Sequence, residues 1–338
     1  MRQAVMTSPG VIEHRNVPEP APGPGQVLLR IKRIGVCGTD LHVYHGKHPF
    51  TPYPVVQGHE FSAVVEAVGK GVKGIEVGRK ATATPQEVCG KCKPCLRGDY
   101  NICDKLKVRG FQAPGVAQDL FVVEAEKVVL LPDSFTPDQG ALIEPTAVAV
   151  HSTGRAGDMK GKNVAVLGAG PIGNLVAQVA RCRGANVLIT DISDFRLEKA
   201  KECGTPATSN PKRETLGEAS KRVFGEEGFD LALECVGIEA TMDAAVEYIN
   251  KGGDIVVLGV FGEKPRIDMS VVGDRELTII GTLMYKYEDY VKAVELIANA
   301  QVITAPLVTK RFPFERYIDA YHFIEKQGDK SLKVMIDL

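Results

Sequence analysis

The second half of the chain alternates short apolar runs with segments whose apolar residues recur at helical spacing. Asn163–Leu167 and Asn186–Thr190 are short, apolar and rich in β-branched residues, a pattern typical of buried parallel strands. Between them, Pro171–Arg183 carries apolar residues at helical spacing and stops before Gly184, a residue that commonly follows the end of a helix. Strand, helix and strand in this order predict a βαβ unit of a parallel sheet.

This alternation continues toward residue 281. Further strands are expected at Phe229–Cys235, Asp254–Leu258 and Leu277–Ile280, and further helices at Glu214–Phe224 and Glu239–Asn250. Strands that alternate with helices favour a doubly wound parallel sheet, the Rossmann type of α/β fold. We place this domain at residues 148–281.

The chain before about Pro145 follows a β pattern instead. Val27–Ile34 and Phe61–Val68 run apolar or alternate, and Pro18–Gly25 is a loop rich in proline and glycine. The segment after residue 281 holds two expected helices and two expected strands, at Tyr287–Asn299, Phe314–Lys326, Val308–Phe312 and Lys333–Asp337. Because two strands are too few for a separate sheet, we expect residues 282–338 to complete a β-rich domain of residues 1–147.

Composition excludes several classes of protein. A chain of 338 residues can bury two cores, and 25% charged with 44% hydrophobic residues is ordinary for a globular protein. The net charge of -1 gives no electrostatic reason to bind nucleic acid or an anionic membrane. No apolar run has the roughly 18 residues of a membrane helix, and the first residues do not resemble a signal peptide. We therefore expect a cytoplasmic protein whose clustered cysteines bind metal.

A glycine motif lies between the first predicted strand and helix of the α/β domain. Gly168 permits a tight turn, Gly170 lets the backbone approach a pyrophosphate, and Gly173 lets the helix and strand pack closely. Asp191 follows 18 residues after Gly173, close to the spacing of a carboxylate that binds ribose. A plain βα turn is the alternative. The residues expected to bind the dinucleotide are Gly168, Gly170, Pro171, Ile172, Gly173, Asp191 and Arg196.

Asp191 also indicates which dinucleotide is bound. A carboxylate accepts hydrogen bonds from the ribose hydroxyls and repels a 2′-phosphate, so NAD is favoured over NADP. Arg196 lies five residues further on and could pair with a 2′-phosphate or lie along the adenosine.

A first metal site is indicated by residues that are far apart in the sequence. Cys37, His59, Glu60 and Glu144 supply one thiolate, one imidazole and two carboxylates, the ligand types of a zinc site that keeps a position open for substrate. Such a zinc lowers the pKa of an alcohol before hydride loss. Taken singly, each residue could equally be an ordinary core or surface residue. His45 and His48 are rival ligands, although their neighbourhood suggests a loop over the site.

A second metal site is indicated by four closely spaced cysteines. Cys89, Cys92, Cys95 and Cys103 lie within 15 residues, a spacing that lets a short loop surround one tetrahedral ion. Four thiolates leave no position for a substrate, so this second zinc would be structural. The alternatives are two disulfides, which the compartment argues against, and an iron–sulfur cluster, whose common spacings differ. The other cysteines (Cys182, Cys203 and Cys235) are expected to be packing residues.

The motifs together resemble the zinc-dependent medium-chain dehydrogenases/reductases, the superfamily of alcohol dehydrogenase. The match spans Cys-Gly-Thr-Asp-x-His from Cys37, Gly-His-Glu from Gly58, the four cysteines, Glu144-Pro145 and the glycine motif. The resemblance implies a GroES-like β-rich domain beside a Rossmann domain. It also implies that Cys37, His59 and either Glu60 or Glu144 hold the catalytic zinc. A glutamate at position 144 points to the sorbitol and threonine dehydrogenase branch.

The same resemblance assigns roles to three residues after Cys37. Thr39 matches the hydroxyl that takes the substrate proton, His42 matches the histidine that passes it to solvent, and Asp40 matches the carboxylate that orients the zinc-bound histidine. From the residues alone, Thr39 and Asp40 read as a polar turn after a strand. The segment Pro114–Leu120 departs from the family pattern, so the substrate pocket is not transferred, and the lining residues are guesses: His45, Tyr53, Phe111, Tyr285 and Lys286.

These observations favour an enzyme that moves hydride from a secondary alcohol of a polyol or sugar acid to NAD. The overall look is closest to L-galactonate 5-dehydrogenases. L-threonine 3-dehydrogenase or a simple alcohol dehydrogenase is the alternative within enzymes, and a non-catalytic zinc- and dinucleotide-binding sensor is the alternative outside them. The expected partners are a small-molecule alcohol and further copies of the chain in a homo-oligomer, either dimer or tetramer, formed by edge pairing of the cofactor domains.

Overall fold

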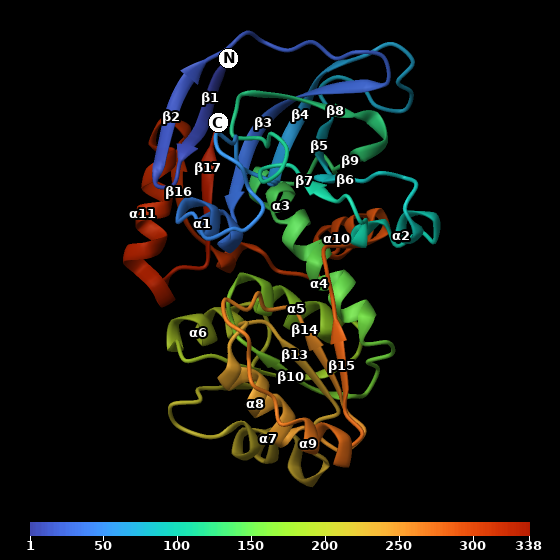
Figure 1. The fold of residues 1–338 in the computed structure, drawn as a ribbon, viewed down its shortest axis with the longest axis vertical. Helices are drawn as coiled ribbons and strands as arrows, with labels where there is room; N and C mark the ends of the chain where they lie inside the picture. Colours follow the sequence, from blue (N-terminus) through green and yellow to red (C-terminus); the bar gives the residue numbers. More distant parts are fainter. The chain divides into compact units, whose positions relative to one another are not determined.

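Six strands in parallel form the sheet of one half of the structure (Figure 1). The computed structural model describes residues 1–338 and divides them into two units. Unit 1 comprises residues 1–144, 286–298 and 308–338, and unit 2 comprises residues 145–285 and 299–307. From the sequence we expect residues 299–307 in the β-rich domain, but in the structure they group with the parallel-sheet unit.

Unit 2 has the strand order β12-β11-β10-β13-β14-β15, with every pair parallel. Its strands are β10 (Asn163–Leu167), β11 (Asn186–Thr190), β12 (Thr208–Ser209), β13 (Leu231–Glu234), β14 (Asp254–Val257) and β15 (Thr278–Gly281). All five residues of β10 are buried, as expected for a central strand that is covered on both faces. Successive strands are added on one side from β10 to β12 and on the other side from β13 to β15. Ligands of such sheets bind at the boundary between the two halves, outside the carboxyl ends of the strands.

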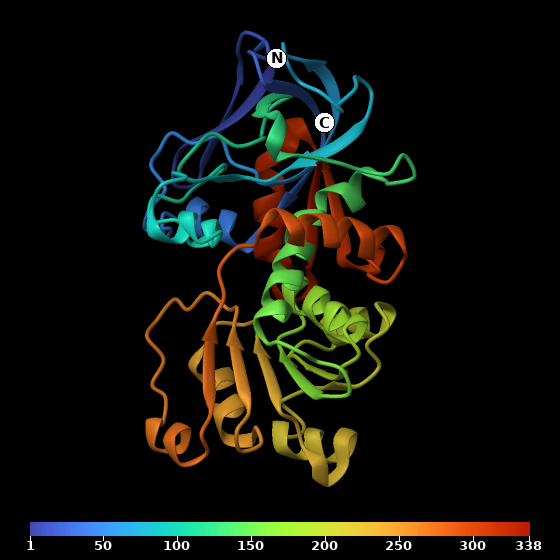
Figure 2. The ribbon, with the colours of Figure 1, turned by 90° about the vertical axis from the view of Figure 1, so that its right-hand side faces the viewer.

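The helices of unit 2 cover the sheet (Figure 2). They are α4 (Ile143–Arg155), α5 (Pro171–Cys182), α6 (Asp194–Glu202), α7 (Leu216–Phe224), α8 (Glu239–Tyr248) and α9 (Met269–Asp274). Helix α5 contacts β10 and β11, α6 contacts β11 and β12, and α7, α8 and α9 contact one another in series. This is the doubly wound α/β fold that the sequence predicts.

Unit 1 is built around a seven-stranded sheet in the order β16-β17-β3-β4-β5-β9, with β8 also paired to β3. These strands are β3 (Gln26–Val36), β4 (Glu60–Val68), β5 (Lys80–Ala83), β8 (Leu120–Glu124), β9 (Val128–Leu130), β16 (Val308–Pro313) and β17 (Lys333–Asp337). Two short pairs accompany it: β1 (Arg2–Ser8) with β2 (Val11–Asn16), and β6 (Gln86–Glu87) with β7 (Lys107–Val108). The last strand of the chain therefore lies beside β3, with Ile336 opposite Ile34.

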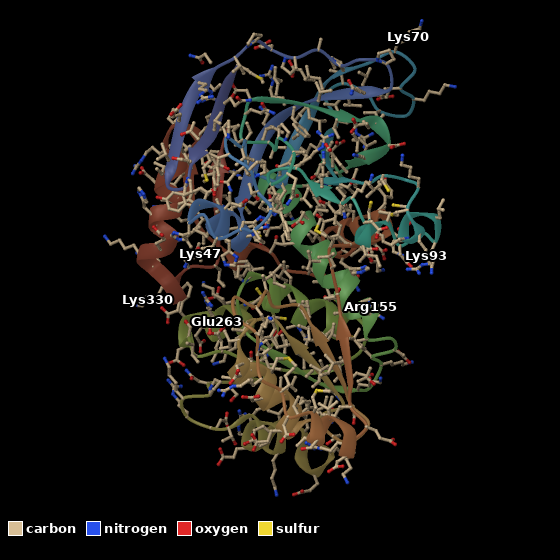
Figure 3. The ribbon with its side chains drawn as sticks, in the orientation of Figure 1. Lys47, Lys70, Lys93, Arg155, Glu263 and Lys330 are labelled. Atoms are coloured by element: carbon tan, nitrogen blue, oxygen red, sulfur yellow. The ribbon has the colours of Figure 1, made fainter.

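Five short helices complete unit 1. They are α1 (Gly38–Tyr44), α2 (Lys93–Leu96), α3 (Pro137–Ala141), α10 (Tyr287–Ala298) and α11 (Tyr317–Gln327). Aromatic side chains of α11, Tyr317 and Tyr321, pack in the same buried cluster as Phe61 and Phe121 of the sheet. Charged side chains such as Lys47, Lys70 and Lys93 extend outward instead (Figure 3). None of the helices combines the length and apolar character needed to cross a bilayer.

Helix α1 corrects the reading of Thr39 and Asp40 as a polar turn. Cys37 caps this helix, and its backbone N–H donates to the Asp40 carboxylate at 2.8 Å, a local bond that starts the helix. Thr39 and His42 therefore lie three residues apart on one helix, on neighbouring positions of its surface.

Candidate active site

Three predicted metal ligands meet where β3 ends and β4 begins. Cys37 follows β3, and His59 and Glu60 stand at the start of β4. The antiparallel register pairs Gly35 with Glu60, which brings these chain positions together. One ligand atom from each of Cys37, His59 and Glu60 lies within 4.8 Å of the other two. The spacing fits a single ion bound between a thiolate, an imidazole and a carboxylate.

The surroundings of His59 are those of a cation site. Its side chain is 5% exposed, and its Nδ1 lies 3.7 Å from Asp40 Oδ1. Neither atom has a hydrogen-bond partner. Burial opposes a charged imidazole, but the Asp40 carboxylate and the Cys37 sulfur outweigh it and raise the pKa of His59 to about 10. So many anionic groups around a buried histidine favour positive charge at this place, which a metal ion would supply.

Glu60 has a buried partner that sequence reasoning did not identify. Lys333 Nζ donates to both carboxylate oxygens of Glu60 at 2.6 Å, and the two residues are 2% and 1% exposed. Gly35 makes room for this pair, because a methyl group added there would clash with the Glu60 carboxylate. Lys333 thus adds one positive charge beside two buried acids and a thiol.

Glu144 lies at the first turn of α4 and is 5% exposed. Its charge acts on the same cluster, since it contributes to raising the pKa of both His59 and Lys333. It does not belong to the group of three ligand atoms that converge. The structure therefore brings Glu60, rather than Glu144, to the cysteine and the histidine.

An aromatic wall stands on one side of His59. The Phe111 ring lies 4.8 Å from the His59 ring and stacks on His48 at 5.2 Å, centroid to centroid. His48 is held further by Thr51, whose Oγ1 lies 2.7 Å from its Nδ1. Of the five guessed pocket residues, Phe111 is the one in ring contact with His59 and can give the site an apolar boundary.

The other guessed pocket residues have partners elsewhere. His45 Nε2 lies 3.0 Å from Glu325 Oε1 of α11, a partner outside the cluster of predicted ligands. The Tyr53 hydroxyl donates to the carbonyl of Val43. Tyr285 is fully buried within unit 2. His45 and Tyr53 thus have contacts within unit 1, and Tyr285 is buried in unit 2, so all three have a structural role in their own unit.

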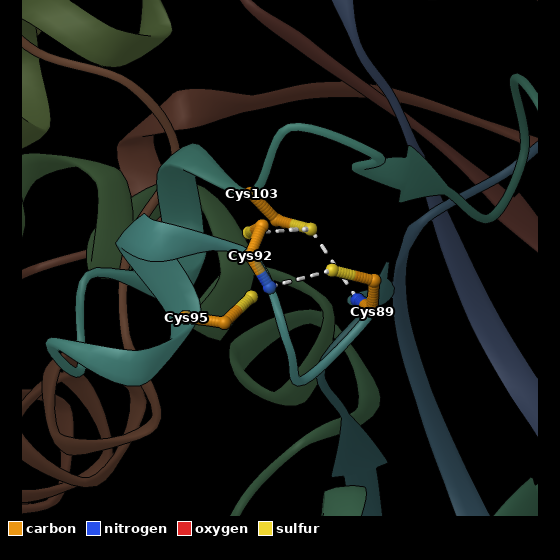
Figure 4. Close-up of side chains that lie close together, drawn as sticks. All are labelled: Cys89, Cys92, Cys95 and Cys103. Atoms are coloured by element: carbon orange, nitrogen blue, oxygen red, sulfur yellow. Dashed lines mark hydrogen bonds between the residues drawn. The ribbon is translucent and has the colours of Figure 1, made fainter.

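The four cysteines form a second cluster, shown in Figure 4. All four sulfurs lie within 4.8 Å of one another, and none forms a disulfide. Backbone N–H groups donate to two of them at 3.3 Å: that of Cys92 to Cys89, and those of Cys89 and Lys105 to Cys103. The N–H groups of Lys91 and then Cys92 lower the pKa of Cys89 to about 6. The Cys89 sulfur is thus ready to bind a metal as a thiolate, whereas burial raises the pKa of Cys95.

The cysteine lobe, residues 89–103, also holds the start of α10. Lys286 Nζ pairs with Asp99 at 3.0 Å, and the backbone N–H of Tyr287 donates to the Tyr100 hydroxyl at 2.6 Å. Lys286, a guessed pocket residue, is thus an anchor between the lobe and this helix.

The glycine motif has the geometry expected of a phosphate-binding turn. Gly168 has a φ of +100°, which an L side chain rarely adopts. A methyl group added at Gly170, the residue that caps α5, would meet nothing within 4 Å, so the helix N-terminus is open to a ligand. A methyl group at Gly173 would clash with the Gly168 carbonyl, which explains the need for glycine there.

Asp191 stands at the carboxyl end of β11 beside this turn. Its Oδ2 accepts from the Ala169 N–H at 2.8 Å and its Oδ1 from the Ser193 N–H at 2.9 Å. Arg196 lies 3.8 Å from the same carboxylate and is partly exposed. The carboxylate is therefore fixed against the glycine turn, while Arg196 covers one of its sides.

Comparison with protein families agrees with both halves of this geometry. Residues 23–133 match the alcohol dehydrogenase GroES-like domain, and residues 171–299 match the zinc-binding dehydrogenase model. The first match contains the predicted ligands Cys37, His59 and Glu60 and the cysteine lobe, and the second contains Gly173, the last glycine of the motif, and Asp191.

Curated relatives cover almost the whole chain. A 2-dehydro-3-deoxy-L-galactonate 5-dehydrogenase from Pseudoalteromonas atlantica is 35% identical over 92% of both chains. A sorbitol dehydrogenase from Halalkalibacterium halodurans is 34% identical over 94% of this chain and 93% of its own. An L-threonine 3-dehydrogenase from Legionella pneumophila is 32% identical over 96% and 95%.

Solved structures share the fold over the full length. A zinc-binding dehydrogenase from Sinorhizobium meliloti bound to NADP superposes with a TM-score of 0.91, at 30% identity, covering 100% of this chain and 99% of that one. A protein from Escherichia coli CFT073, described as a short chain alcohol dehydrogenase in complex with NADH, gives 0.92 at 30% identity with the same coverage. Similar structures thus hold either nicotinamide dinucleotide.

Proposed function

The chain belongs to the zinc-dependent medium-chain dehydrogenases, in the branch of the sorbitol and threonine dehydrogenases, and we propose that it oxidises a secondary alcohol of a sugar acid with NAD. Membership makes it an NAD(P)-dependent enzyme that acts on CH–OH donors, with zinc and a nicotinamide dinucleotide as cofactors. Its substrate is a small alcohol of the polyol, sugar-acid or threonine class.

One observation carries the proposed chemistry. Cys37, His59 and Glu60 converge within 4.8 Å in a buried, anionic setting. Alcohol dehydrogenase binds its catalytic zinc with two cysteines and a histidine. In this chain the Glu60 carboxylate would take the place of the second cysteine. When bound there, zinc supplies Lewis acidity that lowers the pKa of a substrate hydroxyl.

The chain's own residues would then orient the substrate and move its proton. Phe111 gives the site an apolar side, which helps to exclude water. Thr39 is half-buried on α1 and would accept the hydroxyl proton, and His42, exposed one turn later, would pass it to solvent. Asp40 would hold the imidazole of His59 in one orientation from 3.7 Å.

The preference for NAD rests on Asp191. Its carboxylate, fixed by two backbone N–H groups, would accept hydrogen bonds from the ribose and repel the phosphate of NADP. The cysteine lobe would hold a second, structural zinc. Its four sulfurs converge and would fill all four positions of a tetrahedral ion, which leaves none for a substrate.

The test is metal content followed by a substrate panel. We expect two zinc ions per chain, and NAD⁺ reduction with hexonates such as L-galactonate derivatives, weaker reduction with polyols, and the least with threonine and short alcohols. Turnover on threonine alone would move the chain to the threonine dehydrogenases. One zinc ion per chain and no turnover with any alcohol would overturn the catalytic assignment and favour a dinucleotide-binding sensor.

Two variants separate chemistry from cofactor binding. Cys37→Ala should lose the first zinc and nearly all turnover, while NADH still binds, because the glycine motif belongs to the other unit. Cys182→Ser is the matched control, because this cysteine belongs to neither candidate metal site. The variant should leave both zinc content and rate unchanged. Full activity of Cys37→Ala would contradict the assignment.

A further inference from the structure

Glu234 is a buried acid that the reaction described above does not use. It ends β13 and its side chain is 0% exposed. Its Oε1 accepts three hydrogen bonds, from the N–H groups of Val236 and Gly237 at 2.8 Å and from the Thr241 hydroxyl at 2.7 Å. Its Oε2 is buried with no hydrogen-bond partner. A carboxylate inside a protein is costly, so its retention here calls for a specific role.

The carboxylate connects two loops at the carboxyl edge of the sheet. The first loop, residues 235–238, follows β13, and the second, residues 258–260, follows β14. A methyl group added at Gly259 would lie 2.5 Å from Glu234 Oε2, and one added at Gly237 would lie 2.6 Å from the Val260 carbonyl oxygen. The N–H groups of Leu258 and Gly259 donate to the Glu234 carbonyl. Side chain and backbone of Glu234 therefore fix both loops.

The first of these loops packs on the glycine motif. The Cys235 N–H donates to the Leu167 carbonyl at 2.9 Å. A methyl group added at Gly168 would lie 2.6 Å from Val236 Cγ2, so the loop and the phosphate-binding turn touch. A displacement of the loop would thus be felt at the turn that receives the pyrophosphate.

The position of the loops identifies which part of the cofactor they face. The strand order runs outward from β10 on one side and from β13 on the other, and in this fold a dinucleotide binds across the boundary between the two. Asp191 directly follows β11, so the adenosine half would lie on that side and the nicotinamide half would extend toward β13 and β14. Here three apolar side chains are exposed: Val236, Ile238 and Val260, at 40%, 49% and 68%. Exposed apolar groups at a crevice suit a flat, weakly polar ring.

We propose that Glu234 is a positioning residue for the nicotinamide half of the cofactor, acting through the two loops that it holds together. The inference rests on the proposed dinucleotide site. The role follows from the geometry: the carboxylate bonds the loop donors, and the loops present the apolar surface. Glu234 itself touches no substrate and is not a catalytic residue.

The test compares two ligands that share the adenosine half. NADH carries the nicotinamide ring and ADP-ribose does not. Glu234→Gln keeps the shape of the side chain and removes its charge, which weakens the three hydrogen bonds. We expect the Kd of NADH to rise about tenfold and the Kd of ADP-ribose to stay within twofold of the wild-type value. Titration calorimetry or NADH fluorescence measures both.

Two further variants exclude a general loss of structure. Thr241→Val removes one donor to the carboxylate, so it should raise the Kd of NADH by a smaller factor and leave the Kd of ADP-ribose unchanged. Glu239→Gln is the matched control, because its carboxylate lies at the start of the next helix and pairs with Arg266 instead. It should change neither affinity. Asp191→Ala should weaken both ligands.

The outcomes are distinct. Equal weakening of NADH and ADP-ribose by Glu234→Gln would overturn the inference and make the residue a support of the whole unit. Unchanged affinity for both would also overturn it. If the wild-type protein bound neither ligand, the proposed function would fail instead, and this result would be recognised before any variant is measured.

Discussion

Glu60 accepts hydrogen bonds from Lys333 on both oxygens, while one ligand atom each of Cys37 and His59 lies within 4.8 Å of its carboxylate. A metal ion bound at the proposed site would neutralise the same carboxylate as the lysine ammonium. The two cations would then share one anion, so we expect the stability of the unit without metal to depend on Lys333 more than its stability with metal does.

Lys333→Met tests this dependence. Breaking a buried ion pair by removing one partner costs about 3–5 kcal/mol, and we expect a loss of this size in the metal-free protein. With zinc present the loss should be clearly smaller, because the ion compensates Glu60, so zinc should raise the melting temperature of the variant more than that of the wild type. Unfolding is measured by differential scanning fluorimetry with and without zinc.

A control for this variant lies on the neighbouring strand. Lys310 is exposed on β16, opposite Val334, and Lys310→Met should lose little in either state. An equal loss with and without zinc for Lys333→Met would show that the lysine is a packing residue with no link to the metal site.

Asp191 provides a prediction on cofactor choice. Asp191→Asn keeps a hydrogen-bonding group beside the Ala169 N–H but removes the charge that repels a 2′-phosphate. We expect NADH affinity to fall about tenfold and NADPH affinity to improve, helped by Arg196 at 3.8 Å from the same position. The ratio of the two dissociation constants is the measurement. Asp194→Asn, whose acid pairs with Arg213 on the surface, should leave this ratio unchanged.

Residues differ in how far the sequence could predict them. The resemblance to a known family led us to expect Cys37 and His59 in one site together with Glu60 or Glu144, and the choice between the two acids stayed open. Lys333 was not, because its partner lies 273 positions away and a lysine that begins a terminal strand has no local sign of burial. Glu234 likewise lies within the expected strand Phe229–Cys235, and nothing in the local sequence shows that its side chain bonds the following loop.

At the scale of elements, buried strands were the easiest to predict. The ranges Asn163–Leu167, Asn186–Thr190 and Lys333–Asp337 agree with β10, β11 and β17 residue by residue. Each is too short for a typical helix and contains β-branched residues, which favour a strand. Helices α1, α4 and α6 were not predicted. Helix α6 is mostly charged, and α1 begins with Gly-Thr-Asp, so the apolar periodicity that marks a helix is weak in both.

The cysteine lobe gives a prediction at this scale. Its short elements, α2 and the turn Tyr100–Ile102, bury little apolar surface, so the metal would supply most of their order. Cys95→Ser should reduce zinc content by one ion per chain and expose the lobe to trypsin after Lys91 and Arg97. Mass spectrometry of the fragments locates the cuts.

Two results bear on this prediction of lobe order. Cys203→Ser should keep both zinc ions and the trypsin resistance, because this cysteine is buried in unit 2 and bonds the Ile303 carbonyl. If Cys95→Ser kept its zinc and its resistance, the lobe would be ordered by its hydrogen bonds alone, including the pair between Asp99 and Lys286.

At the scale of the whole molecule, the chain passes between its two units several times. Unit 1 needs the tail, because β17 pairs with β3 and supplies Lys333, while residues 299–307 return to unit 2. The sequence indicates that the tail lacks enough strands for a sheet of its own. Where each part of the tail packs depends on long-range contacts, such as those of Gln178 with Ile303, which no local pattern reveals.

The last prediction concerns assembly, through the edge strand β15. This strand has a neighbour on one side only, β14, and leaves a row of backbone donors and acceptors open. Ile279 of this strand is 38% exposed. We expect pairing of β15 with that of a second copy, so light scattering should give at least twice the chain mass of 36.5 kDa. Ile279→Lys should lower this mass, because a charge on an edge strand opposes pairing. It should leave the NADH affinity of unit 2 largely intact, since the residue lies four strands from Asp191 in the sheet order. A wild-type protein with the mass of one chain would contradict the prediction.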